Sequence, residues 1–165
     1  MKLSLTVLIA GFTSLIATNV EVLSDGKVEL HKPVGKDGEG EYTASTKGCF
    51  DVINTALPLV LDSIAAIPMP PKGRPVVVAD YGTADAGTSL GTMNAIVEAA
   101  RARDASVEVS LQYEDQKDNE WKSVFNHALG YKNVTDAYGK VRRSEERRTG
   151  GAAGVERQQC TVFFH

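Results

Sequence analysis

The residues best suited to chemistry lie in one turn between an apolar run and an amphipathic stretch. Residues 75–90 read PVVVADYGTADAGTSL, so the apolar run ends in the acid Asp80 and a loop with Gly82 and Gly87 follows. A strand, a glycine-bearing turn and a helix that starts near Ser89 form the opening unit of nucleotide-binding α/β folds. We therefore expect a ligand at this turn.

Two classes of phosphate ligand fit this turn poorly. Residues 82–89 have the glycine spacing of a P-loop, but Thr88 stands where that loop needs a lysine. Ala84 replaces the central glycine of a dinucleotide fingerprint. In both cases Asp85 would bring a negative charge to a phosphate. A turn with no ligand is a further alternative, because one fold hosts many functions.

S-adenosylmethionine is the third class, and the acids favour it. It has no phosphate and carries a sulfonium cation, so acids near the loop are tolerated and Asp80 can serve its amino acid part. Glu114 or Asp115 ends the next strand and can accept hydrogen bonds from ribose hydroxyls. The sequence therefore favours S-adenosylmethionine as the cofactor over phosphate ligands.

The elements that position these residues follow from hydrophobic periodicity. Helical spacing of apolar residues predicts helices over residues 50–67, 90–103 and 121–129. We expect Pro58 to kink the first helix and Ser45 or Thr46 to cap its start. Gly130 stops the third helix.

Two strands flank the middle helix. The unbroken apolar run at residues 76–79 is typical of a strand buried on both faces of a parallel sheet. Residues 106–113 alternate, which predicts a second strand with one apolar face. The fold class is therefore α/β, with a leading helix and about half of a doubly wound, Rossmann-like domain. Two or three strands would leave exposed sheet edges.

Composition and net charge limit the kinds of partner and site that we expect for this chain. The chain has 165 residues and a net charge of -3, which gives no case for nucleic-acid binding. The histidines are scattered, and Cys49 and Cys160 form no CxxC pair, so we expect neither a metal site nor a disulfide framework.

The chain divides into three segments. Residues 1–37 are an apolar extension and a polar, glycine-rich segment, residues 38–141 are the folded domain, and residues 142–165 are expected to be disordered. Residues 1–17 have the length of a signal peptide but a poor cleavage pattern, and are too short for a stable membrane span. We expect a cytoplasmic protein, or a secreted one if residues 1–17 are a signal peptide.

Three blocks resemble the SABATH-type S-adenosylmethionine-dependent carboxyl methyltransferases, which include the salicylate, jasmonate and theobromine enzymes of plants. Residues 40–49 (GEYTASTKGC) are similar to the family's Tyr-x-x-(Asn/Ser)-Ser-x-x-Gln helix start. Residues 79–89 (ADYGTADAGTS) are similar to its Ala-Asp-Leu-Gly-Cys-Ser-Ser-Gly-Pro-Asn-Thr loop. Residues 114–125 (EDQKDNEWKSVF) resemble its Asn-Asp-Leu-Pro-x-Asn-Asp-Phe-Asn-x-Leu-Phe block. The resemblance covers about residues 38–140, and implies that residues 38–141 are a partial S-adenosylmethionine-binding domain.

The resemblance implies a site and a reaction. The implied cofactor-binding residues are Ser45, Thr46, Asp80, Gly82, Thr83, Thr88, Asp115 and Gln116. Tyr42 and Cys49 are implied on the side of the substrate, a small-molecule carboxylic acid. The family transfers a methyl group to that carboxylate mainly by positioning, with no general base, so no catalytic side chain is implied. A homodimer is implied in the same way.

The chain departs from the family in several respects. Cys49 replaces the glutamine that contacts the substrate carboxylate, and Ala86 replaces a glycine of the loop. The family's later strands, its Ser-Phe block and its helical substrate cap have no counterpart here, so we expect a truncated domain whose C-terminal half is missing. A non-catalytic fragment or pseudoenzyme is the first alternative. A secreted binding protein is the second, and it rests on residues 3–17 and the glycosylation sequon at residues 133–135.

Overall fold

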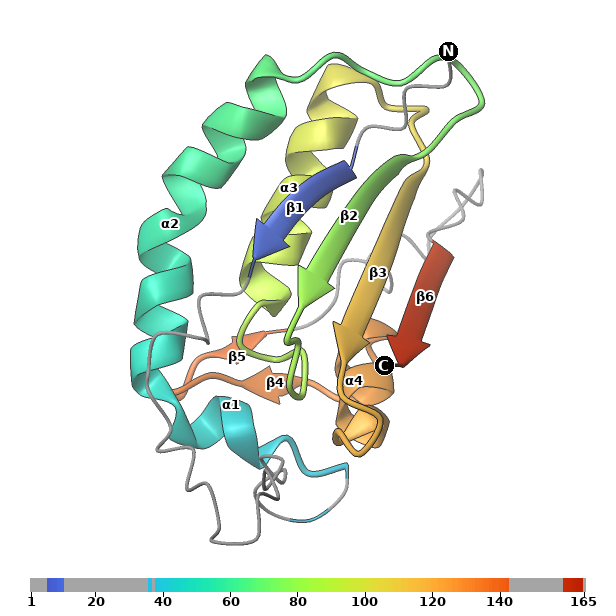
Figure 1. Cartoon of the computed structure of the whole chain (residues 1–165). Coiled ribbons are helices and arrows are strands. Elements are labelled where there is room, and N and C mark those ends of the chain that lie inside the picture. The colour runs from blue at the N-terminus through green and yellow to red at the C-terminus, as the bar shows by residue number, and fades with distance from the viewer. Residues whose placement is uncertain (1–5, 11–35, 37, 143–158, 165) are drawn as a thin grey trace, which may run out of the picture.

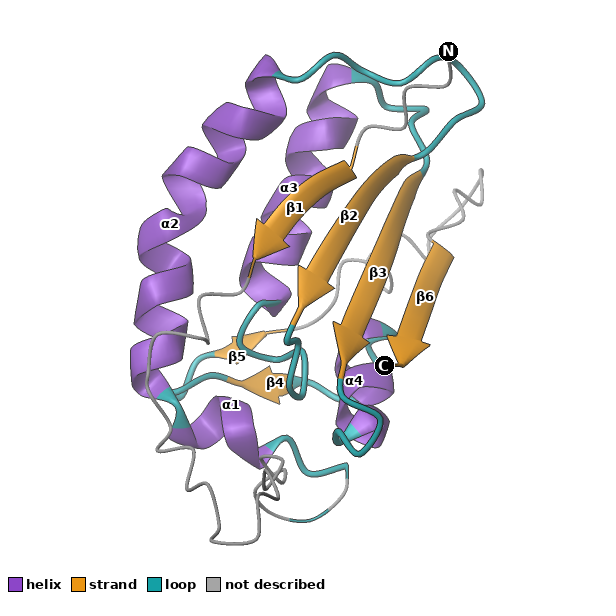
Figure 2. Ribbon diagram, in the orientation of Figure 1, coloured by secondary structure: helices purple, strands orange, loops and turns teal. Residues whose placement is uncertain are grey.

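A parallel sheet of four strands organises the molecule (Figures 1 and 2). The computed structural model describes residues 6–10, 36, 38–142 and 159–164. The sheet has the order β1-β2-β3-β6, with bounds Thr6–Ala10, Val76–Tyr81, Val109–Asp115 and Gln159–Phe164. A short antiparallel pair is formed by β4 (Val134–Thr135) and β5 (Val141–Arg142). The helices are α1 (Glu41–Ser45), α2 (Lys47–Ala66), α3 (Leu90–Arg103) and α4 (Trp121–Ala128).

The two central strands confirm the predicted pair. The strand predicted at residues 76–79 continues to Tyr81, and the second runs over Val109–Asp115, slightly later than predicted. They are parallel and in register from Val76 beside Val109 to Tyr81 beside Glu114. Both strands therefore end at the same edge of the sheet, with Asp80 close to that edge on one and Asp115 on the other.

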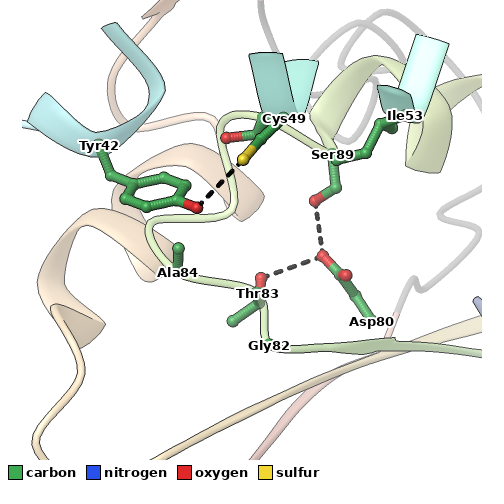
Figure 3. Close-up of a pocket in the computed structure, with 9 residues that line it drawn as sticks. Tyr42, Cys49, Ile53, Asp80, Gly82, Thr83, Ala84 and Ser89 are labelled. Carbon is green, nitrogen blue, oxygen red and sulfur yellow. Dashed lines mark hydrogen bonds between the residues drawn. The ribbon is translucent and has the colours of Figure 1, made fainter. Parts of the chain in front are cut away.

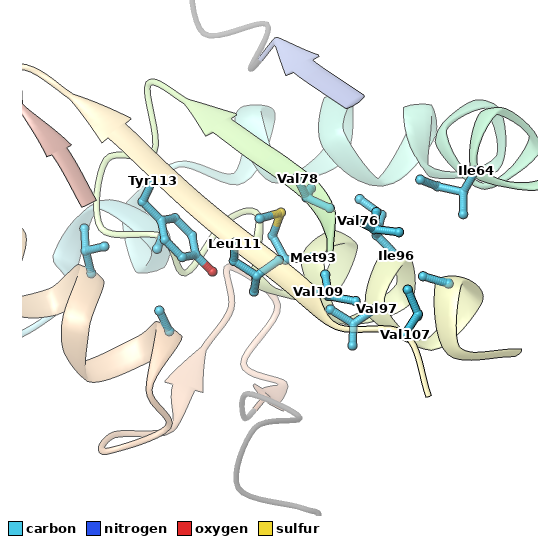
Figure 4. Packing of buried hydrophobic residues seen from close by; sticks show 14 residues of the cluster. Ile64, Val76, Val78, Met93, Ile96, Val97, Val107, Val109, Leu111 and Tyr113 are labelled. Carbon is cyan, nitrogen blue, oxygen red and sulfur yellow. The ribbon is translucent and has the colours of Figure 1, made fainter. Parts of the chain in front are cut away.

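The core lies between this strand pair and α3 (Figure 4). Alternate side chains of each strand are buried on the helix side, as the pattern at residues 106–113 predicts: Val76, Val78, Val109, Leu111 and Tyr113. They pack against Met93, Ile96 and Val97 of α3. Burying an aliphatic side chain contributes roughly 1.5–3 kcal/mol, so this contact holds α3, and the turn that leads into it, against the sheet.

The outer strands differ from the prediction. The apolar run Thr6–Ala10 pairs with β2, and Gln159–Phe164 pairs with the other edge of the pair, at β3. The expected disorder of residues 142–165 is therefore wrong for Arg142, which ends β5, and for Gln159–Phe164. Residues 143–158 and 165 lie outside the described part of the chain. The reason is that a short apolar run becomes a strand through its partner, which local periodicity does not report. Both edges of the predicted pair are thereby covered.

The strand order qualifies the expected domain type. The α/β class is confirmed by the parallel sheet and its helices. Among the described strands the order follows the chain without reversal, whereas a doubly wound sheet reverses its order at a switch point. The described residues therefore form a parallel α/β sheet without the switch point of a doubly wound domain.

The leading helix α2 differs from expectation at its start. It runs without interruption through Pro58. Thr46 occupies the predicted N-cap position but makes no side-chain capping bond. The hydroxyls of Ser45 and Thr46 donate to backbone carbonyls of α1 rather than to the first amides of α2. Within the described residues, α2 alone has the length and apolar composition to cross a membrane, and core helices pass the same test. A single helix of this kind is weak evidence of a membrane span, so we assign none to α2.

Candidate ligand-binding site

The turn after β2 is held in an unusual backbone path. Gly82, Ala84 and Ala86 have φ angles of 71°, 50° and 60°, all in the left-handed region that favours glycine. The amide N–H groups of Gly82 and Thr83 donate to the Glu114 carbonyl at 2.9 and 3.3 Å. The turn is thus tied to the end of β3, at the carboxyl edge of the sheet.

Asp80 is the acid that this turn encloses. Its side chain is 4% exposed, and its Oδ2 accepts hydrogen bonds from Ser89 Oγ at 2.5 Å and Thr83 Oγ1 at 3.0 Å. Burial raises the pKa of Asp80 to about 6, although both hydroxyl bonds lower it. At neutral pH the carboxylate is therefore charged and poorly solvated, which favours a cationic partner.

A pocket of about 290 Å³, counting the part open to solvent, lies against Asp80 (Figure 3). Only about 20 Å³ of it is comparable with the volumes of small-molecule sites, roughly 300–1,000 Å³, so the pocket in this state is much smaller than such a site. Its lining comes from α1, α2 and the turn: Tyr42, Cys49, Ile53, Asp80, Gly82, Thr83, Ala84, Thr88 and Ser89. None of these lining residues is lysine, arginine or histidine, so Asp80 sets the charge of the pocket.

The opposite wall consists of Tyr42 and Cys49. The Tyr42 hydroxyl lies 3.6 Å from the Cys49 sulfur. Burial, followed by the hydrogen bond with Cys49, raises the pKa of Tyr42 well above its usual value. The phenol is therefore neutral at any working pH, and can donate a hydrogen bond toward an anionic group in the pocket.

Asp85 does not point into this pocket. It is 1% exposed and accepts hydrogen bonds from the amide N–H and the hydroxyl of Thr43, at 2.9 and 2.5 Å. Its backbone carbonyl lies 2.7 Å from Nδ1 of the buried His127. The charge expected to repel a phosphate is thus directed toward α1, and Asp80 is the acid that faces the pocket.

Asp115 and Asn119, at and just after the end of β3, hold the turn by hydrogen bonds to Ala84. Oδ2 of Asp115 accepts a hydrogen bond from the Ala84 amide at 2.8 Å, and Oδ1 accepts one from the Gln116 amide at 2.7 Å. Asn119 Nδ2 donates to the Ala84 carbonyl at 2.6 Å. The third sequence block therefore fixes the turn. The carboxylate has further lone pairs that can accept hydroxyl donors.

The pocket brings together six of the ten predicted site residues: Tyr42, Cys49, Asp80, Gly82, Thr83 and Thr88. Asp115 and Gln116 follow at the adjacent strand end without lining it. Ser45 and Thr46 also lie outside the lining, since their hydroxyls bond within α1. The sequence prediction missed Ile53, Ala84 and Ser89. A hydroxyl at the helix start, opposite an acid that ends a strand, is the signal that identifies Ser89.

Comparison with known proteins gives no family. No protein-family model matches the chain, and no curated protein matches it. Among the described residues, no group of His, Cys, Asp and Glu could hold a metal ion. The geometry of the pocket is therefore what indicates a function for this chain.

Proposed function

We propose that the chain is an S-adenosylmethionine-dependent methyltransferase of the SABATH type that methylates the carboxylate of a small-molecule acid. The observation that carries this proposal is the buried Asp80 carboxylate, which is the charged group lining a pocket at the carboxyl end of β2. Ligands of parallel α/β sheets bind at this end of the strands.

The charge of the pocket favours this cofactor over a nucleotide phosphate. A phosphate beside the Asp80 carboxylate would meet like charge in a poorly solvated site. The amino group of S-adenosylmethionine is a cation, and donates a charge-assisted hydrogen bond to the same carboxylate. Thr83 and Ser89 orient that carboxylate through their hydroxyls.

The other predicted residues fit the remainder of the cofactor. Gly82 leaves the turn open for close approach of a ligand to the backbone. Asp115 stands at the end of β3, where an acid accepts hydrogen bonds from ribose hydroxyls in nucleotide-binding folds. When bound, the cofactor supplies an activated methyl group, so this chain has to orient the two reactants.

The wall formed by Tyr42 and Cys49 suits the acid substrate. The neutral Tyr42 phenol can donate a hydrogen bond to a carboxylate, and the adjacent Cys49 adds a weak donor. The substrate carboxylate is already ionised at neutral pH, so no general base is needed. The product is a methyl ester.

Transfer of radiolabelled methyl from S-adenosylmethionine tests the proposal. The purified chain is incubated with a panel of small aromatic and aliphatic carboxylic acids, and base-labile methyl esters are counted. We expect ester formation with at least one acid, and its loss in Asp80→Asn. Cofactor binding without ester formation on any acid would favour the non-catalytic alternative, and absence of both would contradict the proposal.

A further inference from the structure

We infer that Asp85 is a positioning residue whose carboxylate latches α1 against the turn, and that release of this latch opens the pocket. The latch consists of Asp85, Thr43 and Gly87. The inference rests on the proposed function only because S-adenosylmethionine is taken as the ligand that enters the opened pocket. The latch itself is a property of the chain.

The contacts of the latch are buried and specific. Asp85 accepts hydrogen bonds from the Thr43 amide at 2.9 Å, the Thr43 hydroxyl at 2.5 Å and the Gly87 amide at 3.0 Å. Thr43 is fully buried, and its hydroxyl also lies 3.2 Å from that of Thr88. One carboxylate therefore joins a helix and a turn that lie 42 residues apart in the chain.

The latch affects the pocket because α1 and the turn, which it joins, both carry residues that line the pocket. Tyr42 precedes Thr43 and lines the pocket from α1, whereas Thr83, Ala84 and Thr88 line it from the turn. Separation of Thr43 from Asp85 would move the Tyr42 wall away from Asp80. It would also expose more of Cys49, which is already half-buried rather than buried and whose sulfur contacts the Tyr42 hydroxyl.

The backbone on either side of α1 permits such a movement. α1 has five residues, too few to be stable as an isolated helix. Gly40 before it has a φ of 71°, and Thr46 after it has a φ of -105° and a ψ of 65°, so neither flanking residue is helical. The position of α1 is therefore set by its tertiary contacts, which beside the pocket include the Asp85 latch and the contact of Tyr42 with Cys49.

Close packing adds to the hydrogen bonds. A Cβ at Gly87 would lie 2.4 Å from Thr43 Oγ1. The turn and α1 thus touch without an intervening side chain.

The test measures how fast an aromatic disulfide reagent modifies Cys49, in a Cys160→Ser background. Thr43→Val removes the hydroxyl at constant volume, and Thr43→Ser retains it. Thr92→Val is the matched control, because Thr92 is also buried but its hydroxyl has no hydrogen-bond partner among the described residues. We expect Thr43→Val to speed modification about tenfold, which corresponds to loss of one hydrogen bond to a charged group, and Thr43→Ser and Thr92→Val to leave the rate near that of the parent.

Urea separates a latch from a general loss of stability. Opening of α1 exposes little surface, so the rate in Thr43→Val should be nearly constant over low urea concentrations. A rate that rises steeply with urea in that variant, or one unchanged from the parent, would overturn the latch.

Saturating S-adenosylhomocysteine separates the latch from the proposed function. Protection of Cys49 by this compound supports both. Faster modification in Thr43→Val without protection in the parent keeps the latch and contradicts the proposed cofactor.

Discussion

The hydroxyl of Ser89 donates to the buried carboxylate of Asp80 across 2.5 Å, and so joins the start of α3 to the end of β2. The bond bridges the whole turn, since the two residues stand at its opposite ends. Burial disfavours the charged form of Asp80 and raises its pKa to about 6, whereas the hydrogen bond from Ser89 stabilises that charged form. The pocket thus keeps a carboxylate at a cost in stability, which is usual for functional sites.

The first prediction follows from that cost. Asp80→Asn removes the buried charge and should stabilise the ligand-free protein by up to about 3 kcal/mol at pH 8, the equivalent of a pKa change of roughly two units. Urea unfolding of the parent and the variant gives the difference. A variant less stable than the parent at pH 8 would show that the Asp80 charge stabilises the fold.

The second prediction concerns pH. Because the folded-state pKa of Asp80 lies above its ordinary value of 3.8, its proton is bound more tightly in the folded chain. Binding of this proton thus stabilises the folded chain fully below about pH 4, and that stabilisation is lost as the pH rises through about 6. The stability advantage of Asp80→Asn should therefore grow between pH 4 and pH 7. Thermal unfolding of both proteins across this range checks the sign, and a gap that does not change with pH would contradict it.

The third prediction concerns Gly87. A methyl group at this position would meet Thr43 Oγ1 at 2.4 Å and Val134 Cγ1 at 3.0 Å. Gly87→Ala should destabilise the chain by about 1–3 kcal/mol, as expected for overpacking. Gly48→Ala in α2 is the control, because its Cβ meets nothing within 4 Å, and it should stabilise by up to about 1 kcal/mol. Equal effects of the two substitutions in urea unfolding would be inconsistent with close contact between α1 and the turn.

The fourth prediction concerns backbone strain at Ala84. Its φ of 50° is one that alanine rarely adopts. Ala84→Gly should therefore be neutral or stabilise by up to about 1 kcal/mol, despite the greater freedom of glycine in the unfolded chain. Ala56→Gly in the interior of α2 should destabilise by roughly 1 kcal/mol. Calorimetry compares the two, and a cost at Ala84 equal to that at Ala56 would argue against the left-handed turn.

Local patterns predicted much of this fold. The apolar run before Asp80, the alternation around Val109 and the periodicity of α3 depend on neighbouring residues, and they give strands and a helix at the predicted places. The strand at Gln159–Phe164 depends on a distant partner, β3, and has no local pattern. Local reasoning therefore assigned its residues to a disordered tail.

The site shows the same division. Asp80 was predicted as a ligand contact because an acid that ends a buried strand before a glycine turn has a local signature. Asp85 was interpreted as a charge in the turn, since its partner Thr43 lies in another block of the sequence. Ser45 and Thr46 were assigned by resemblance, whereas their hydroxyls bond within α1.

The central claim is that Asp80 binds the cationic amino group of S-adenosylmethionine. Isothermal titration of S-adenosylhomocysteine into the parent protein and into Asp80→Asn at pH 8 tests it most directly, because the product keeps that amino group and does not react. We predict one site in the parent, and binding at least about thirtyfold weaker in the variant, as expected when one partner of a buried charge pair is removed. Absence of binding to the folded parent, or equal affinity of the two proteins, would contradict the account.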